Sequence, residues 1–147
     1  MTATCFVGTN ALVYARDASE PKKQAAAAAW MRRLWETQTG RLSVQVLNEF
    51  YVIVTQKLKP GLDRQSAKEE ILTLMAWEPV PIDAEVMRRA WLVQDTYSFS
   101  WWDALIISAA LRSGCRFLLS EDMQAGQDLF GLKIVNPFRT PPDSFLS

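Results

Sequence analysis

Short apolar runs that end in turn residues recur along the chain and predict buried strands. Five segments have this pattern: 4–8 (TCFVG), 41–44 (RLSV), 78–82 (EPVPI), 115–122 (CRFLLSED) and 131–138 (GLKIVNPF). The prolines of segment 78–82 are typical of an edge strand, because proline cannot donate a ladder hydrogen bond. The first run ends on a glycine, Gly8.

The segments between these runs have helix start and stop signals and apolar residues at helical spacing. We expect helices in segments 9–17, 19–40, 45–58, 63–75, 83–97 and 100–114. Asp63, Asp83 and Ser100 are the expected N-caps of the last three. Gly114 follows the end of the last helix, and Pro21 lies in the first turn of the long second one.

Strands and helices therefore alternate along the chain. Such alternation predicts an α/β fold, in which a parallel sheet carries helices on both faces. Ligands of this architecture bind beyond the carboxyl ends of the strands, at a topological switch point. Functional side chains are expected at or just after those strand ends.

The composition is that of a globular protein, with 49% hydrophobic and 22% charged residues in a chain of 147. Its 16 basic and 16 acidic residues cancel, so any contact with nucleic acid must be local. No apolar run approaches the length of a membrane span, and the N-terminal residues lack the basic start of a signal peptide. We therefore expect a cytoplasmic protein without a membrane partner.

Cysteine and histidine usage narrows the chemistry. The two cysteines, Cys5 and Cys115, each begin an apolar strand-like segment, which favours reduced, buried thiols over a disulfide. The chain has no histidine. This absence excludes Ser-His and Cys-His catalysis and nearly every zinc site. Carboxylates must carry any catalysis.

Glu49 interrupts a helix that is otherwise apolar, and an unpaired charge there would be costly or would be protonated. The helix offers Glu49 no basic residue at a spacing of three or four positions. A structural ion pair with a distant arginine, or a hydrogen-bonded neutral acid, is one interpretation. A functional carboxylate is the interpretation that we favour.

Asp103 is expected to point from the first turn of its helix toward the core side, with Ile106 and Ile107 on the same face. The alternative is a capping box with Ser100, in which the acid only satisfies a backbone amide. The neighbouring Trp101 and Trp102 fit a core or an interface better than a base-stacking platform.

Asp122 directly follows a buried strand, which is the cleft position of an α/β fold. Glu121 and Asp122 are equally compatible with solvated turn residues. Ser120 beside them offers a hydroxyl group. Other acids fit surface or capping roles: Asp17, Glu20 and Asp128.

A cluster of carboxylates without histidine or cysteine is suited to Mg²⁺ or Mn²⁺, which prefer oxygen ligands and reach substrate phosphates through water. Such ions activate water and neutralise charge on a phosphoryl group. Metal-dependent hydrolysis of a phosphodiester is therefore the natural interpretation.

Four segments together resemble the PIN-domain ribonucleases, in particular the VapC-type toxins of toxin–antitoxin pairs: CFVGTNALVYA, LSVQVLNEFYVIVT, SFSWWDALIISAALRSGCRFLLSED and GLKIVNPF. The resemblance covers residues 3–138. It implies a three-layer α/β/α sandwich with a five-stranded parallel sheet, in a single domain of residues 1–138 followed by a tail, 139–147. It also implies a ribonuclease that uses Mg²⁺ or Mn²⁺, forms a homodimer and is blocked by an antitoxin.

The same resemblance assigns roles to individual residues. Glu49, Asp103 and Asp122 correspond to metal-binding acids of the family. Asn10 corresponds to the polar residue that orients the site, and Thr9 and Ser120 contribute hydroxyl groups. Family members read D-T-N where this chain reads G-T-N, so the resemblance implies that Gly8 stands in place of the first metal-binding aspartate.

Loss of one ligand should lower metal occupancy and weaken RNA cleavage. Natural loss of activity and a disarmed variant of a growth-inhibiting nuclease would both give this pattern, and the remaining acids favour the second. Another explanation is that the backbone at position 8 has a positive φ, which glycine adopts readily, so that the glycine has only a conformational role. Two further functions stay open: a non-catalytic module that binds antitoxin or RNA, and a phosphate-handling or receiver-like domain.

RNA would be held by local basic residues, since phosphate contacts supply most of the affinity. Candidates occur on and near the second predicted helix: Arg16, Lys22, Lys23, Arg32 and Arg33. A solvated helix face without RNA contacts is an equally good interpretation of these positions.

Overall fold

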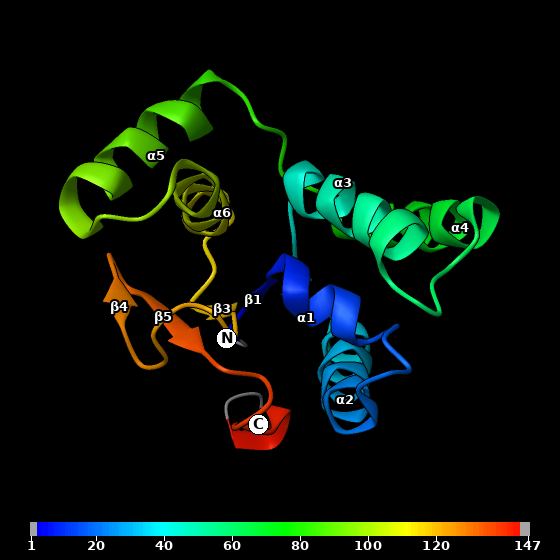
Figure 1. Cartoon of the computed structure of the whole chain (residues 1–147). Coiled ribbons are helices and arrows are strands. Elements are labelled where there is room, and N and C mark those ends of the chain that lie inside the picture. The colour runs from blue at the N-terminus through cyan, green and yellow to red at the C-terminus, as the bar shows by residue number, and fades with distance from the viewer. Residues whose placement is uncertain (1–2, 145–147) are drawn as a thin grey trace.

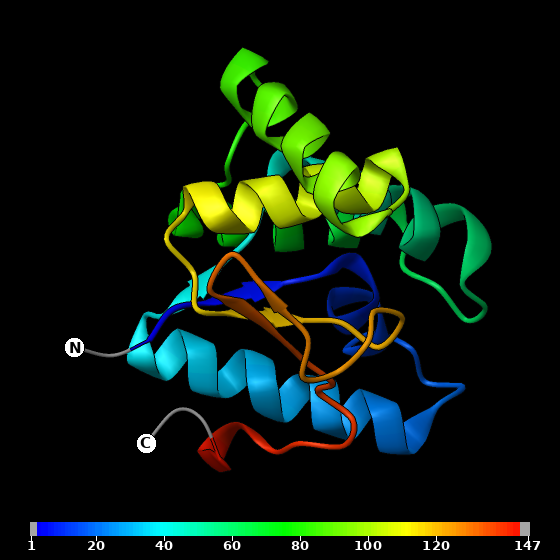
Figure 2. The same ribbon diagram turned by 90° about the vertical axis from the view of Figure 1, so that its left-hand side faces the viewer.

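The computed structural model describes residues 3–144 and has three layers. Helix α2 (Pro21–Thr37) covers one face of the central sheet, and α3 (Val44–Val52) and α6 (Trp101–Arg112) cover the other (Figures 1 and 2). Helix α5 (Ala84–Tyr97) packs outside α6, and α4 (Arg64–Leu74) lies beyond α3. The expected α/β/α sandwich is confirmed.

The sheet has five strands in the order β2-β1-β3-β5-β4. Their bounds are Cys5–Val7 (β1), Gly40–Arg41 (β2), Phe117–Leu119 (β3), Asp128–Leu129 (β4) and Leu132–Val135 (β5). All neighbours pair in parallel except β4 and β5, which are antiparallel. In the centre, Phe6 is opposite Leu118, and Leu118 is opposite Ile134. The expected number of strands is confirmed, but the sheet is mostly rather than wholly parallel.

The prediction of a strand at 78–82 is wrong. Only Val80 pairs there, in a single parallel bridge with Ser43, because the flanking Pro79 and Pro81 have no amide hydrogen to extend a ladder. The fifth strand is instead β4, which forms a tight hairpin with β5. Its turn uses a positive φ of 94° at Gly131 and a 2.8 Å hydrogen bond from the Gly131 amide to Asp128 Oδ1.

The predicted N-cap residues of the last three helices are confirmed. Asp63, Asp83 and Ser100 accept hydrogen bonds at 2.7, 3.0 and 3.2 Å from the backbone amides three positions later. Helix α1 (Thr9–Tyr14) ends earlier than expected. The helix expected over 45–58 is divided: α3 ends at Val52, and a π-helical turn, η1 (Ile53–Lys57), continues from it.

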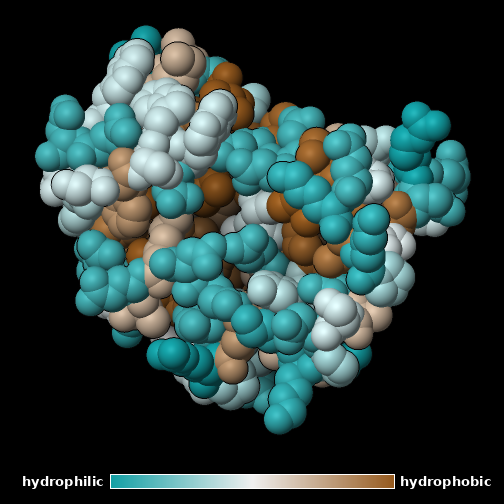
Figure 3. Space-filling view, in the orientation of Figure 1, coloured by the Kyte–Doolittle hydropathy of each residue, from teal (hydrophilic) through white to brown (hydrophobic). Residues whose placement is uncertain are grey.

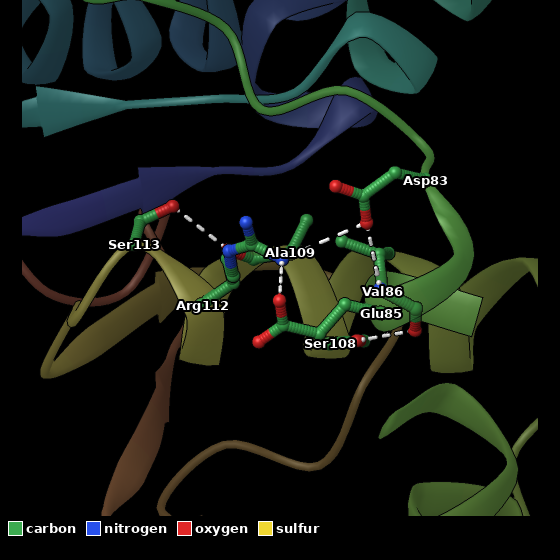
Figure 4. A network of polar contacts seen from close by, with 7 residues as sticks. All are labelled: Asp83, Glu85, Val86, Ser108, Ala109, Arg112 and Ser113. Atoms are coloured by element: carbon green, nitrogen blue, oxygen red, sulfur yellow. Dashed lines mark hydrogen bonds and ion pairs between the residues drawn. The ribbon is translucent and has the colours of Figure 1, made fainter. Parts of the chain in front are cut away.

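Helix α6 is the central support of the site. Its residues 104–110 are all buried, and Figure 4 shows how polar contacts hold it against the start of α5. The Ser108 hydroxyl donates to the Val86 carbonyl at 2.7 Å, and Arg112 Nη1 lies 2.7 Å from Glu85 Oε2 and 3.6 Å from Asp83 Oδ1. These contacts fix the helix that carries Asp103.

Both cysteines are buried and unpaired, as expected. Within residues 3–144, no helix is long and apolar enough to cross a membrane. The described part of the expected tail, 139–144, lies against α2, where the buried Trp30 donates its indole N–H to the Thr140 carbonyl at 2.9 Å. The boundary at residue 138 stays a prediction, and residues 145–147 lie outside the described part.

Candidate active site

A cleft of about 530 Å³ opens beyond the carboxyl ends of β1 and β3. The chain leaves β1 toward β2 on one side and β3 toward β5 on the other, so this is a topological switch point. Figure 3 shows the corresponding face, which is hollowed near its centre, with apolar surface inside a rim of hydrophilic side chains. The residues assigned to the catalytic and metal site from the sequence all line the cleft: Gly8, Thr9, Asn10, Glu49, Asp103, Ser120 and Asp122. Their catalytic roles stay predictions.

Gly8 joins β1 to α1 and is tightly packed. Its backbone is extended, with φ −73° and ψ 164°, so the explanation by a positive φ is wrong. Its amide donates to the Leu119 carbonyl at 3.1 Å. A Cβ at position 8 would lie only 2.6 Å from the same oxygen, so β1 and β3 would have to move apart slightly to admit a side chain.

Glu49 is held by neutral donors rather than by a cation. The Thr9 hydroxyl donates to Oε1 at 2.5 Å, and Gln45 Nε2 donates to Oε2 at 3.2 Å. Gln45 is buried and donates from the same nitrogen to the Trp102 carbonyl at 3.1 Å. Gln45 thus links α3 to the first turn of α6. Sequence reasoning missed it because only basic partners were considered four positions before Glu49.

Asp122 lies in the turn after β3 and is oriented by Asn10, whose side-chain amide donates to Oδ2. The two residues come from the ends of neighbouring parallel strands, where side chains are brought together. Ser120 Oγ accepts the Met123 amide at 3.2 Å and so shapes the turn. The turn places Asp122 at the cleft with its side chain exposed, so its role as a functional acid rather than a solvated turn residue stays a prediction.

Asp103 lies in the first turn of α6. Its amide donates to the Ser100 hydroxyl, as a cap requires. Burial raises the pKa of the Asp103 carboxyl, and the charges of Asp122 and Glu49 raise it further, while the Ser100 hydroxyl lowers it. Repulsion from the other two acids places all three carboxylates in one electrostatic environment.

The alternative in which arginines neutralise these acids is not supported. Within the described residues, no ion pair involves Glu49, Asp103 or Asp122. Glu121, next to Asp122, instead points to Lys23, with Oε1 at 2.7 Å from Nζ.

The remaining acids have local roles. Asp17 is buried and accepts the Ser19 amide at 3.0 Å. Glu20 is the exposed N-cap residue of α2. Asp128 shapes the β4–β5 turn. Glu20 and Asp128 are exposed, as expected, but the burial of Asp17 in the turn before α2 differs from the expected surface or capping role.

The basic residues that were expected to hold RNA are not part of the cleft. Arg16 and Lys23 form ion pairs with Glu70 and Glu121, and none of the five candidates lines the cleft. Lys57, which sequence reasoning did not select, does line it. Trp101 stacks on Trp91 with ring centroids 5.6 Å apart, and Trp102 is 61% exposed.

The side-chain atoms that could ligate a metal in the cleft are carboxylate, hydroxyl and amide oxygens. These are the ligand types that Mg²⁺ or Mn²⁺ prefers. They do not form a complete ligand set. Within residues 3–144, no three acidic, cysteine or histidine side chains gather closely enough to hold a metal ion. Position 8, where a further acid is implied, has no side chain. The fit of a metal to this chain is therefore incomplete.

Comparisons with known proteins place the chain in a family. The family model for the PIN domain matches residues 5–125, and the chain belongs to this family. Strands β4 and β5 extend the fold past the matched segment. A comparison with curated proteins found no match.

Two solved structures share the fold. A chain of VapBC2 from Rickettsia felis, crystallised with a DNA fragment from the promoter, is 16% identical, with a TM-score of 0.63 over 90% of this chain and 98% of that one. Mycobacterium tuberculosis VapC20, a toxin that cleaves the sarcin–ricin loop, is 18% identical, with a TM-score of 0.59 over 81% and 90% of the two chains.

Proposed function

We propose that this chain is a VapC-like toxin of a type II toxin–antitoxin pair, an endoribonuclease whose cleavage of RNA is weakened by Gly8. The observation that carries the proposal is that Glu49, Asp103 and Asp122 line one cleft, which Gly8 lines as well. The structural likeness to VapC20, a toxin that cleaves the sarcin–ricin loop, supports RNA as the substrate class.

The polar neighbours of the acids have a defined task in this proposal. Thr9 and Gln45 hold Glu49, and Asn10 holds Asp122, so that two carboxylates keep their orientation without a cation. The family's Mg²⁺ or Mn²⁺ would supply activation of water and neutralisation of phosphate charge. In this chain a ligand position is missing, and we expect low occupancy and slow cleavage.

The test compares RNA cleavage in Mn²⁺ by the unsubstituted Gly8 chain (called the wild type in the experiments below), Gly8→Asp and Gly8→Asn. Asparagine is the matched control because it has the same Cβ contact with Leu119 and almost the same shape, but no charge. We expect cleavage by Gly8→Asp to exceed that of the other two by about 100-fold. Equal activity in Gly8→Asp and Gly8→Asn, with both variants folded, would refute the proposal.

A non-catalytic module that binds antitoxin or RNA on the same fold is the second candidate. It is favoured by the incomplete ligand set and by the neutral hydrogen bonds of Glu49 and Asp122. An inactive Gly8→Asp variant that still binds an antitoxin or RNA would favour this candidate. An antitoxin partner is supported by the likeness to a VapBC2 chain, and homodimer formation and a cytoplasmic location complete the proposal.

A further inference from the structure

We propose that Lys57 binds a phosphate of the RNA at the acidic cleft and is the residue that lets a polyanion approach it. The inference rests on the proposed function for the identity of the ligand. Its basis in the structure is the position of Lys57 on the wall that also carries Glu49.

The charge of the cleft creates the need for such a residue. Three carboxylates line it, and among the described residues Lys57 is the only lysine or arginine that does so. A phosphate backbone is repelled by carboxylates, and nucleic-acid affinity comes largely from lysine and arginine contacts. An incomplete metal site leaves the neutralisation of RNA charge to the protein itself.

The π-helical turn directs Lys57 to the cleft. In an unbroken α-helix, eight residues rotate through about 800°, which would leave Lys57 roughly 80° away from Glu49. A π turn advances by roughly 80° per residue, so the turn over Ile53–Lys57 brings Lys57 to within roughly 20° of the Glu49 direction. Such turns are rare in proteins overall, but those that occur are frequently found at functional sites.

The loop after the turn holds this geometry in place. The Leu58 amide donates to the Ile53 carbonyl at 2.8 Å, which closes the π turn, and the Leu62 amide donates to the Val54 carbonyl at 2.8 Å. A Cβ at Gly61 would collide with the carbonyl oxygens of Val54 and Leu58. The absence of a side chain at Gly61 therefore allows the loop to close tightly against the turn.

Lys57 is available for a ligand. Its side chain is exposed, and among the described residues no ion pair involves it. Lys59, two positions later, is also exposed but does not line the cleft. A substitution at Lys59 changes the net charge equally and gives a matched control.

The test measures binding of a fluorescein-labelled, single-stranded RNA of mixed sequence, in EDTA so that no divalent ion contributes. Kd is determined over a range of salt concentrations for the wild type, Lys57→Gln, Lys57→Arg and Lys59→Gln. Each phosphate contact with a single strand contributes about 0.7 to the slope of log K against log salt. We expect Lys57→Gln to bind more weakly with a slope smaller by about 0.7, and Lys57→Arg to keep the wild-type slope.

The slope of log K against log salt should stay close to the wild-type value in Lys59→Gln, in contrast to Lys57→Gln. A wild-type slope in Lys57→Gln, or an equal loss in both glutamine variants, would overturn the inference while RNA binding by the chain stands. Failure of the wild-type chain to bind the RNA at any salt concentration would overturn this inference together with RNA as the proposed ligand.

Discussion

Gly8 and Leu119 are joined so closely that one carbonyl oxygen fills the space a side chain would need. The Gly8 amide lies 3.1 Å from that oxygen, and a Cβ at position 8 would lie 2.6 Å from it. The backbone at Gly8 is otherwise compatible with any residue, because its φ is −73°. The obstacle to an aspartate is therefore contact between neighbouring strands.

We expect Gly8→Ala to destabilise the fold by about 1–3 kcal/mol, the usual cost of inserting a group into a packed site. The measurement is the midpoint of urea unfolding at unchanged m-value. An unchanged or higher midpoint would contradict the tight contact, and would also mean that an aspartate fits without strain.

Substitution of Asp103 should stabilise the protein in a pH-dependent way. The pKa of Asp103 is raised by burial and by the charges of Asp122 and Glu49, so the folded state binds this proton more tightly than the unfolded state. Its stabilising contribution is complete below the unfolded pKa and is lost as pH rises through the folded one. Asp103→Asn should therefore raise the Tm at pH 7, with a gain that shrinks as the pH falls through the folded pKa and is absent below the unfolded one.

Asp95→Asn is the control for this measurement, because Asp95 is an exposed acid on α5. A Tm of Asp103→Asn below the wild-type value at pH 7 would indicate that the carboxylate stabilises the fold, as a capping acid does. The interpretation of Asp103 as a functional acid whose charge destabilises the fold would then be wrong.

The contacts between α5 and α6 should differ in strength (Figure 4). Ser108 is buried, so Ser108→Ala removes a buried hydrogen bond to the Val86 carbonyl and should cost about 1–1.5 kcal/mol. Arg112 and Glu85 are partly exposed, so Arg112→Gln should cost less than about 1 kcal/mol. Chemical denaturation of both variants gives the comparison, and a larger loss for Arg112→Gln would contradict it.

The two cysteines should not react in the native protein. Burial raises the pKa of Cys115 to about 11, and the pKa of Cys5 well above its ordinary value. The thiolate is the reactive form, so alkylation with iodoacetamide at pH 8 should require unfolding. Rapid modification of either residue under native conditions would show that the start of β1 or β3 opens.

Local signals in the sequence predicted the helix starts because capping is a short-range effect. Asp63, Asp83 and Ser100 each bind an amide only three residues away. Strand β4 was missed because its two residues have no pattern of their own and depend on the hairpin with β5. Segment 78–82 has an apolar strand-like pattern, but its prolines restrict pairing to one bridge.

The acids of the cleft were predictable because strand ends and an interrupted apolar helix are visible in the sequence. The residues that hold and accompany them were not. Gln45 is recognised only once α6 brings the Trp102 carbonyl beside it. Lys57 lines the cleft at the end of a π-helical turn, for which the sequence gives no signal.

The central claim of the proposal is that position 8 is the missing ligand of a cleft that Glu49, Asp103 and Asp122 still line. Electron paramagnetic resonance of Mn²⁺ titrated into the wild type, Gly8→Asp and the double variant Gly8→Asp/Asp103→Asn tests it directly. We expect Gly8→Asp to bind Mn²⁺ more tightly than the wild type by about tenfold or more, and the double variant to lose that gain. Equal Mn²⁺ affinity in all three folded proteins would contradict the claim.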